Sequence, residues 1–242
     1  MTAATMTNPR ATPQVGRRFY LIMALAMAAV FVAGFSTTVP GDFAPSPGLP
    51  LLLHIHGAVF TCWVLVFVAQ PAFIARGSLK LHRKVGMFGA VLAAAMVVMG
   101  LAATFYAVRY HLVPSFFPPS IFLVMNGIGI LVFGGLVAAG VTLRRKSEWH
   151  KRLMLCATVS ILGPGLGRLL PMDSFGKAAP LVMFGVIALF AFAGPVMDLV
   201  VRRRIHPAYF WGVGVVLISM ILIGPLAFSP PALALLKVIR PG

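Results

Sequence analysis

The sequence predicts an all-α protein, a polytopic bundle of seven transmembrane helices, and three observations support this fold class. The 242 residues are 60% hydrophobic, with a mean hydropathy of +0.98. Seven apolar segments have lengths near the roughly 20 residues that a helix needs to cross the hydrocarbon core of a bilayer. Fifteen of the twenty Lys and Arg residues fall in four short clusters between these segments.

The expected spans are residues 19–39, 51–75, 85–108, 120–143, 153–170, 179–201 and 208–228. The fifth is the shortest and contains Gly163-Pro164-Gly165, so we expect it to be kinked, because proline lacks the N–H that a helix needs. Residues 1–18 are expected to form a disordered tail. Residues 19–228 would form one transmembrane domain, and residues 229–242 a short C-terminal tail.

The distribution of positive charge predicts the orientation. The clusters precede the first span and follow the second, fourth and sixth; they are Arg10/Arg17/Arg18, Arg76/Lys80/Arg83/Lys84, Arg144/Arg145/Lys146/Lys151/Arg152 and Arg202/Arg203/Arg204. Basic loops mark the cytoplasmic side. We therefore expect a multi-pass protein of a bacterial inner membrane, with the N-terminus in the cytoplasm and the C-terminus outside. The net charge of +16 is then an orientation signal, and a nucleic-acid partner is not expected. The first apolar run is long for a signal peptide, so we expect it to be retained.

Ionisable residues in a span are costly, which makes each one a functional candidate. On the cytoplasmic side, His82, His150 and His206 open the third, fifth and seventh spans, and Asp198 lies about one turn inside the sixth. From His82, helical spacing gives a face of small residues, which favours close helix packing or a flat ligand against the backbone.

The outer half carries a second set of candidates. His56, Trp63 and Gln70 are spaced by seven residues and therefore share one helix face. Arg168 is five helical turns, about 27 Å, from His150 on the same face of the fifth span. We expect Arg168 to face the bundle near His56 and to receive an anionic or carbonyl-bearing group, such as a quinone head or a lipid phosphate.

Over residues 50–172, these residues resemble a functionally uncharacterised family of bacterial multi-pass inner-membrane proteins. The shared motifs occur in order as His56-Gly57, Gln70-Pro71, His82-Arg83-x-x-Gly86, His150-x-Arg152-x-Met154 and Gly167-Arg168-Leu169. In general plan the group is similar to b-type di-haem membrane cytochromes, in which bundle histidines ligate haem. That likeness implies an inner ligand pair of His82 and His150.

These residues suit three functions. The first is that of an electron-transfer protein with haem b, in which His82 and His150 ligate the iron. The propionates would be neutralised by the neighbouring cations Arg83, Lys84, Lys151 and Arg152. Bis-His ligation leaves no open position on the iron, which favours electron transfer over oxygen chemistry. Quinone or another small apolar ligand would be a partner beside the lipid bilayer.

The second reading is a zinc-dependent membrane hydrolase, with His82, His150, His206 and Asp198 as ligands, since nitrogen and carboxylate ligands suit zinc. The third is a non-enzymatic protein, which would be a small transporter, a sensor or an accessory subunit of a membrane complex, none of which requires a cofactor. Interrupted helices such as the one at Pro164 line binding sites in transporters.

Overall fold

The computed structural model describes residues 11–38 and 50–240, and the described residues form helices joined by short loops, with no strand among them. Six helices are long and apolar enough to cross a membrane. They are α1 (Ala11–Ser36, with the apolar stretch Arg18–Ser36), α3 (Leu51–Ala75), α4 (Leu79–Arg109), α5 (Pro119–Thr142), α9 (Ala179–Arg202) and α10 (Pro207–Ala227). The prediction of a multi-pass helical membrane protein is thereby confirmed.

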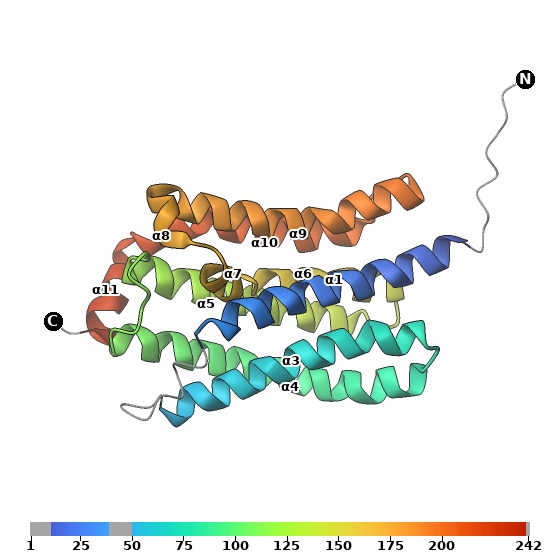
Figure 1. Cartoon of the computed structure of the whole chain (residues 1–242), viewed down its shortest axis with the longest axis horizontal. Helices are drawn as coiled ribbons and strands as arrows, with labels where there is room; N and C mark the ends of the chain where they lie inside the picture. Colours follow the sequence, from blue (N-terminus) through green and yellow to red (C-terminus); the bar gives the residue numbers. More distant parts are fainter. Residues whose placement is uncertain (1–10, 39–49, 241–242) are drawn as a thin grey trace, which may run out of the picture.

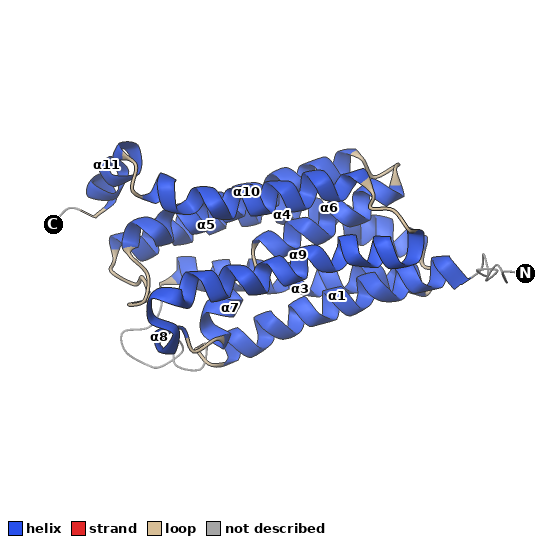
Figure 2. Ribbon diagram, turned by 90° about the horizontal axis from the view of Figure 1, so that it is seen from above, coloured by secondary structure: helices blue, strands red, loops and turns tan. Residues whose placement is uncertain are grey.

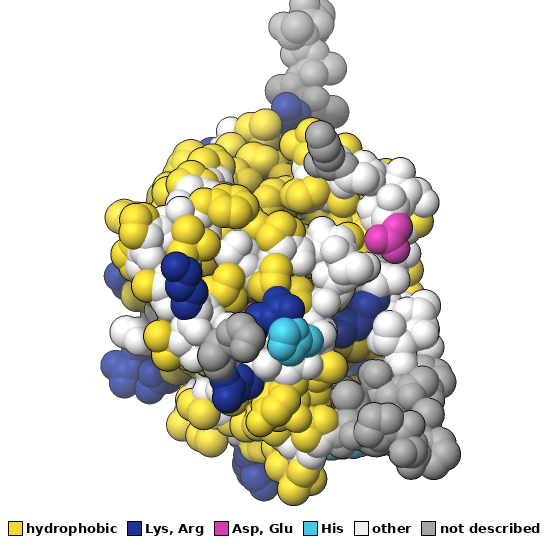
Figure 3. All heavy atoms as spheres, turned by 90° about the vertical axis from the view of Figure 1, so that its left-hand side faces the viewer, with side chains coloured by type: hydrophobic (Ala, Val, Ile, Leu, Met, Phe, Trp, Pro, Cys, Tyr) yellow, Lys and Arg dark blue, Asp and Glu magenta, His cyan; other side chains and the backbone are white. Residues whose placement is uncertain are grey.

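The long helices run lengthwise in one bundle (Figures 1 and 2). α9 and α10 lie along one side, α3 and α4 along the other, with α1 between them (Figure 1). The basic segments 76–84, 143–152 and 202–206 all lie at the end where α1 begins, which we call the basic end (Figure 1). The other end, which we call the far end, carries dispersed Lys and Arg side chains among apolar ones (Figure 3).

The expected fifth span is not one continuous helix. It consists of α6 (Ser147–Ser160) and α7 (Gly163–Leu169), which are separated by a turn at Ile161 and Leu162. Pro164 lies in the first turn of α7, where its missing N–H costs nothing. The kink expected at Gly163-Pro164-Gly165 is therefore a complete break.

α6 lies in the middle of the bundle, in contact with α1, α5, α9 and α10. Five consecutive residues, 155–159, are buried, so every face of the helix is covered by protein. α7 packs against α1, where Gly34 lies directly against the carbonyl oxygen of Gly165. A broken backbone at membrane depth is tolerated only when protein covers it in this way.

The remaining helices lie at the far end. After α7 come the short α8 (Met172–Phe175) and the 3-10 helix η1 (Gly176–Ala178), which lead into α9. α11 (Pro230–Ile239) follows α10 and contacts α4 and α5. Arg109 donates to the carbonyl of Ile239 at 3.0 Å. The tail expected from residue 229 thus contains an apolar helix, and α1 begins at Ala11, inside the segment expected to be disordered; residues 1–10 lie outside the described part.

Candidate functional site

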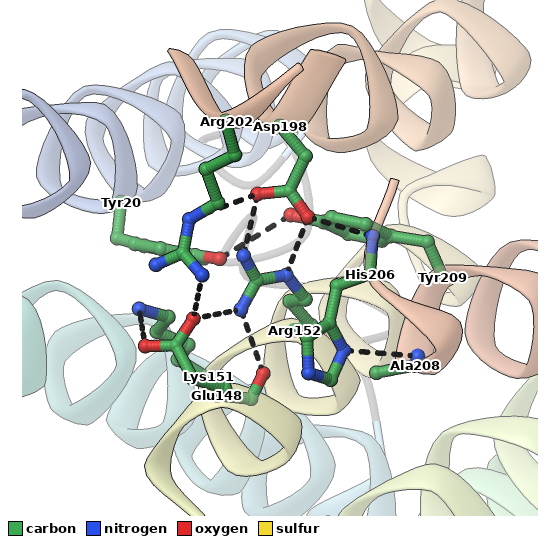
Figure 4. Close-up of polar contacts among 9 residues, drawn as sticks. All are labelled: Tyr20, Glu148, Lys151, Arg152, Asp198, Arg202, His206, Ala208 and Tyr209. Atoms are coloured by element: carbon green, nitrogen blue, oxygen red, sulfur yellow. Dashed lines mark hydrogen bonds and ion pairs between the residues drawn. The ribbon is translucent and has the colours of Figure 1, made fainter. Parts of the chain in front are cut away.

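A buried ion pair joins α6 to α9 at the basic end (Figure 4). Arg152 and Asp198 are both fully buried. Arg152 donates to the two Asp198 oxygens, with Nε to Oδ2 at 2.8 Å and Nη2 to Oδ1 at 2.5 Å. The pair is bidentate, which is the strongest geometry for guanidinium and carboxylate.

Glu148 completes the coordination of Arg152 from the first turn of α6. Its Oε2 accepts from Arg152 Nη1 at 2.7 Å and lies 2.6 Å from Nη1 of Arg202. Its Oε1 lies 2.6 Å from Nζ of Lys151. Burial alone would raise the pKa of the Glu148 carboxyl, but the hydrogen bonds and charges of these cations outweigh it and lower the pKa to about 2. Glu148 therefore stays ionised at neutral pH and balances part of the positive charge at this end.

Two tyrosines lie beside the network, with their hydroxyls directed at each other (Figure 4). The hydroxyls of Tyr20 on α1 and Tyr209 on α10 are 3.3 Å apart. The ring of Tyr209 lies 5.4 Å from the Arg152 guanidinium, and that of Tyr20 lies 5.4 Å from Lys151 Nζ. Tyr209 packs directly on the backbone of Gly194. The network thus connects α1, α6, α9 and α10, and its geometry is that of a structural clamp with its buried charges paired.

His206 contacts this clamp through its backbone, and its ring contacts two of the helices that the clamp joins. Its backbone N–H donates to Asp198 Oδ2 at 3.1 Å, and its ring Nδ1 accepts from the N–H of Ala208, which caps α10. In the described part of the chain, no three His, Cys, Asp or Glu side chains gather as a metal ion requires. The geometry therefore gives no support to the zinc set of His82, His150, His206 and Asp198, because Asp198 is already bound to Arg152.

A second pair of side chains meets at the same end, on the other side of α6. The rings of His82 on α4 and His150 on α6 have their centres 6.2 Å apart and lie at 86° to each other. Their expected proximity is confirmed. His150 Nδ1 lies 2.9 Å from the carbonyl oxygen of Gly140 on α5. Because a carbonyl only accepts, Nδ1 carries a proton, and in the neutral tautomer Nε2 then holds the lone pair.

Four buried side-chain nitrogens have no hydrogen-bond partner within the described residues, and all four lie on α3 or at the start of α4. They are His56 Nδ1, Trp63 Nε1, Gln70 Nε2 and His82 Nδ1. The first three share a face of α3, as their spacing predicts. Trp63 is only 2% exposed and packs edge-on against Phe133. An unpaired buried polar atom costs about 1–3 kcal/mol, so a row of them indicates where a bound group would complete the hydrogen bonding.

The inner members of this row adjoin the histidine pair. The side-chain oxygen of Gln70 lies 3.6 Å from the position that a Cβ on Gly86 would take, and Gly86 is one turn beyond His82. Further along α4, Gly89 faces Val66 of α3, and Gly100 faces Phe60 and Ile130. The small face of α4 therefore serves helix packing along most of its length.

Arg168 lies at the far end, on α7. Its Nη1 donates to the carbonyl of Pro164 at 3.0 Å, its Nε donates to Thr38 at 3.2 Å, and its guanidinium stacks on Phe35 at 4.4 Å. The guanidinium thus binds a carbonyl of its own chain at the helix break. The side chain is exposed, while His56 is stacked on Phe60 at 4.2 Å. A quinone head or lipid phosphate at Arg168 stays a prediction.

Comparisons of this chain with protein-family models, with curated proteins and with solved structures found no match. The residues of the basic end therefore carry the functional argument.

The pairing of Arg152 with Asp198 is not among the features expected from the sequence. Arg152 was expected to bind a haem propionate, yet its donors are directed at Asp198 and Glu148 and its side chain is buried. A signal was present. Asp198 is the one acidic residue of the chain that falls inside an expected span, and such a residue pairs with an opposite charge.

Proposed function

We propose that this chain holds one b-type haem at the basic end, between His82 and His150, and transfers electrons. The observation that carries the proposal is the 6.2 Å separation of the two ring centres on different helices. Metal–imidazole bonds are about 2.0–2.1 Å long, so two rings at this separation would both be close enough to ligate one iron atom.

The side chains of this pair fit such a group. The bond from His150 Nδ1 to Gly140 is the outer contact that fixes the orientation of a metal-binding imidazole and leaves Nε2 as the ligand atom. The buried nitrogens His82 Nδ1 and Gln70 Nε2 have no hydrogen-bond partner among the described residues, so the hydrogen bonding beside the histidine pair is incomplete. A bound haem would supply a one-electron change between ferric and ferrous iron. Two histidine ligands exclude substrate from the iron, which favours electron transfer.

Basic residues that would neutralise the haem propionates directly follow the two histidines in the sequence. Arg83 and Lys84 directly follow His82 and are exposed, and Lys151 follows His150. In this proposal Arg83 and Lys84 neutralise the propionates, whereas Arg152 holds α6 in place through Asp198. Quinone or a membrane-complex partner as electron donor or acceptor stays a prediction.

We further propose seven crossings of a bacterial inner membrane, with the N-terminus in the cytoplasm. α6 begins at the basic end and α9 begins at the far end, so α6 and α7 together would make the fifth crossing. Reporter fusions after Arg204 and after Tyr110 should then report opposite sides, with Arg204 in the cytoplasm. The same side for both would contradict this topology.

The haem proposal is tested by absorption spectra of the purified protein, first oxidised in air and then reduced with dithionite. We expect a Soret band that shifts on reduction and about one haem per chain by pyridine haemochrome assay. A colourless preparation from cells supplied with haem precursor would contradict the proposal.

A second function class, a small transporter, sensor or accessory subunit, is favoured by a different observation. The unpaired nitrogens follow α3 from His56 to Gln70, which is a rise of about 21 Å, and the break between α6 and α7 resembles the interrupted helices of transporters. A haem-free protein whose stability rises with one class of small solute would support this class.

A further inference from the structure

A groove of about 630 Å³ runs along the outside of the bundle between α5, α6 and α10. Its wall is almost wholly apolar, and it includes Ile128 on α5, Leu143 directly after α5, Trp149 on α6, and Trp211 and Val215 on α10. The groove lies on lipid-facing surface, since Leu131 in its wall is 55% exposed and Trp211 is 66% exposed. Its chemistry suits a hydrocarbon chain.

The length of the groove matches a chain that is held along the protein. From Ile128 to the end of α5 at Thr142, the helix rises about 21 Å, whereas half of a bilayer hydrocarbon core is about 15 Å thick. The groove therefore covers the full depth of one leaflet, beginning at the basic end. Gly135 lies in its wall, and a Cβ on Gly135 would meet no protein atom. The absent side chain keeps the groove open there.

The basic end of the groove is bordered by cations that have no carboxylate partner. Arg144, Arg145 and Lys146 link the groove residue Leu143 to the start of α6, and all three are exposed. In the described ranges, no carboxylate lies within 4 Å of any of them. The ion pairs at this end are formed by Lys151, Arg152 and Arg202. Among the described residues, three positive charges without a carboxylate neighbour therefore lie beside the apolar groove, at the level expected for lipid headgroups.

We propose that this groove binds one anionic phospholipid, with an acyl chain along α5 and the phosphate at Arg144, Arg145 and Lys146. Basic pockets between helices on the cytoplasmic side recognise anionic headgroups. Trp149 and Trp211 lie beside the headgroup, where indole rings are favoured. Trp149 is held by an edge contact with His206, with ring centres 5.5 Å apart. The site does not depend on haem, because it faces lipid and contains neither His82 nor His150.

The test uses native mass spectrometry of the full chain in detergent with equal amounts of phosphatidylglycerol and phosphatidylcholine that carry the same acyl chains. We expect one phosphatidylglycerol to be retained in preference to phosphatidylcholine. Near a surface each basic residue contributes about 1 kcal/mol of attraction to anionic lipid. Replacing Arg144, Arg145 and Lys146 by Gln should therefore lower phosphatidylglycerol affinity roughly 100-fold.

Matched variants separate this site from general attraction to the membrane surface. Gly135→Leu fills the groove and should abolish retention of both lipids, whereas Gly185→Leu makes the same change at an exposed position of α9 and should leave retention unchanged. Replacing Arg76, Lys80 and Arg204, which are exposed, by Gln removes equal charge from the other loops of the basic end and should also have little effect. Helix content by circular dichroism checks that each variant is folded.

Three results would overturn the proposal. The first is equal retention of both lipids by the unmodified chain. The second is undiminished retention by folded Gly135→Leu protein. The third is an equal loss of affinity from the two charge-removal variants, which would show general attraction to the basic end instead of a site.

Discussion

Removing the carboxylate of Asp198 leaves Arg152 buried without its main partner. Asp198 accepts two hydrogen bonds from Arg152, at 2.8 and 2.5 Å, and one from the N–H of His206 at 3.1 Å. Neither Asp198 nor Arg152 has any exposed surface. Breaking a buried pair by deleting one partner costs about 3–5 kcal/mol. We therefore expect Asp198→Ala to lower the free energy of unfolding by about 3–5 kcal/mol.

The cost arises from the uncompensated charge, so replacing both partners should restore much of the stability. A double variant, Arg152→Met with Asp198→Leu, removes both charges and keeps apolar volume, and such replacements are often neutral. We expect this double variant to be more stable than either single one. Free energies of unfolding are measured by titration with SDS in mixed micelles, with Asp173→Ala, an exposed acid at the far end, as the control expected within about 0.5 kcal/mol of the unmodified chain.

A double-mutant cycle gives the deciding number. If the pair is coupled as its geometry indicates, the two single losses will sum to clearly more than the loss in the double variant. Strictly additive losses would refute the reasoning, because they would mean that Arg152 and Asp198 stabilise the bundle independently.

Two further predictions concern other parts of the bundle. The folded-state pKa of Glu148 is about 2, below the value near 4.3 expected for an unfolded chain, so its contribution to stability is complete above about pH 4.3 and is lost as pH falls toward 2. Glu148→Gln should therefore flatten the acid part of a curve of stability against pH. An acid slope that is unchanged in Glu148→Gln would contradict this prediction. At the crossing of α1 and α7, a Cβ on Gly34 would collide with the carbonyl oxygen of Gly165, so Gly34→Ala should lower the free energy of unfolding by about 1–3 kcal/mol. Gly57 has open space around it, so Gly57→Ala should be neutral or slightly stabilising. Equal melting temperatures for these two variants would refute the close crossing.

Much of the fold could be predicted from sequence because the bilayer imposes a simple rule. Apolar length predicts the spans, and the basic clusters predict which loops share an end. The break after Ser160 was signalled by Gly163-Pro164-Gly165, since a proline removes a helix hydrogen bond. The helix Pro230–Ile239 was missed because ten residues are too few to span the membrane, and hydropathy alone does not distinguish an end helix from a tail.

The site was less predictable because side-chain partners depend on helix rotation and packing. His82 and His150 each lie near the start of a helix that begins at the basic end, so the sequence predicts that they share this end. Helix packing then places the centres of their rings 6.2 Å apart. The same reasoning assigned Arg152 to a ligand, although the intramembrane Asp198 required a cation. The row of unpaired nitrogens on α3 could be anticipated as a shared face from the seven-residue spacing, but their lack of partners is visible only in the folded structure.

The central claim, a haem held between His82 and His150, is tested most directly by ligand substitution followed by spectroscopy. His82→Ala and His150→Ala proteins, with His54→Ala as the control, are purified and compared in reduced-minus-oxidised absorption spectra and in haem content per chain. The account predicts that either ligand variant loses the low-spin bis-histidine spectrum, while the control retains it. A low-spin spectrum and haem content unchanged in both His82→Ala and His150→Ala would contradict the account.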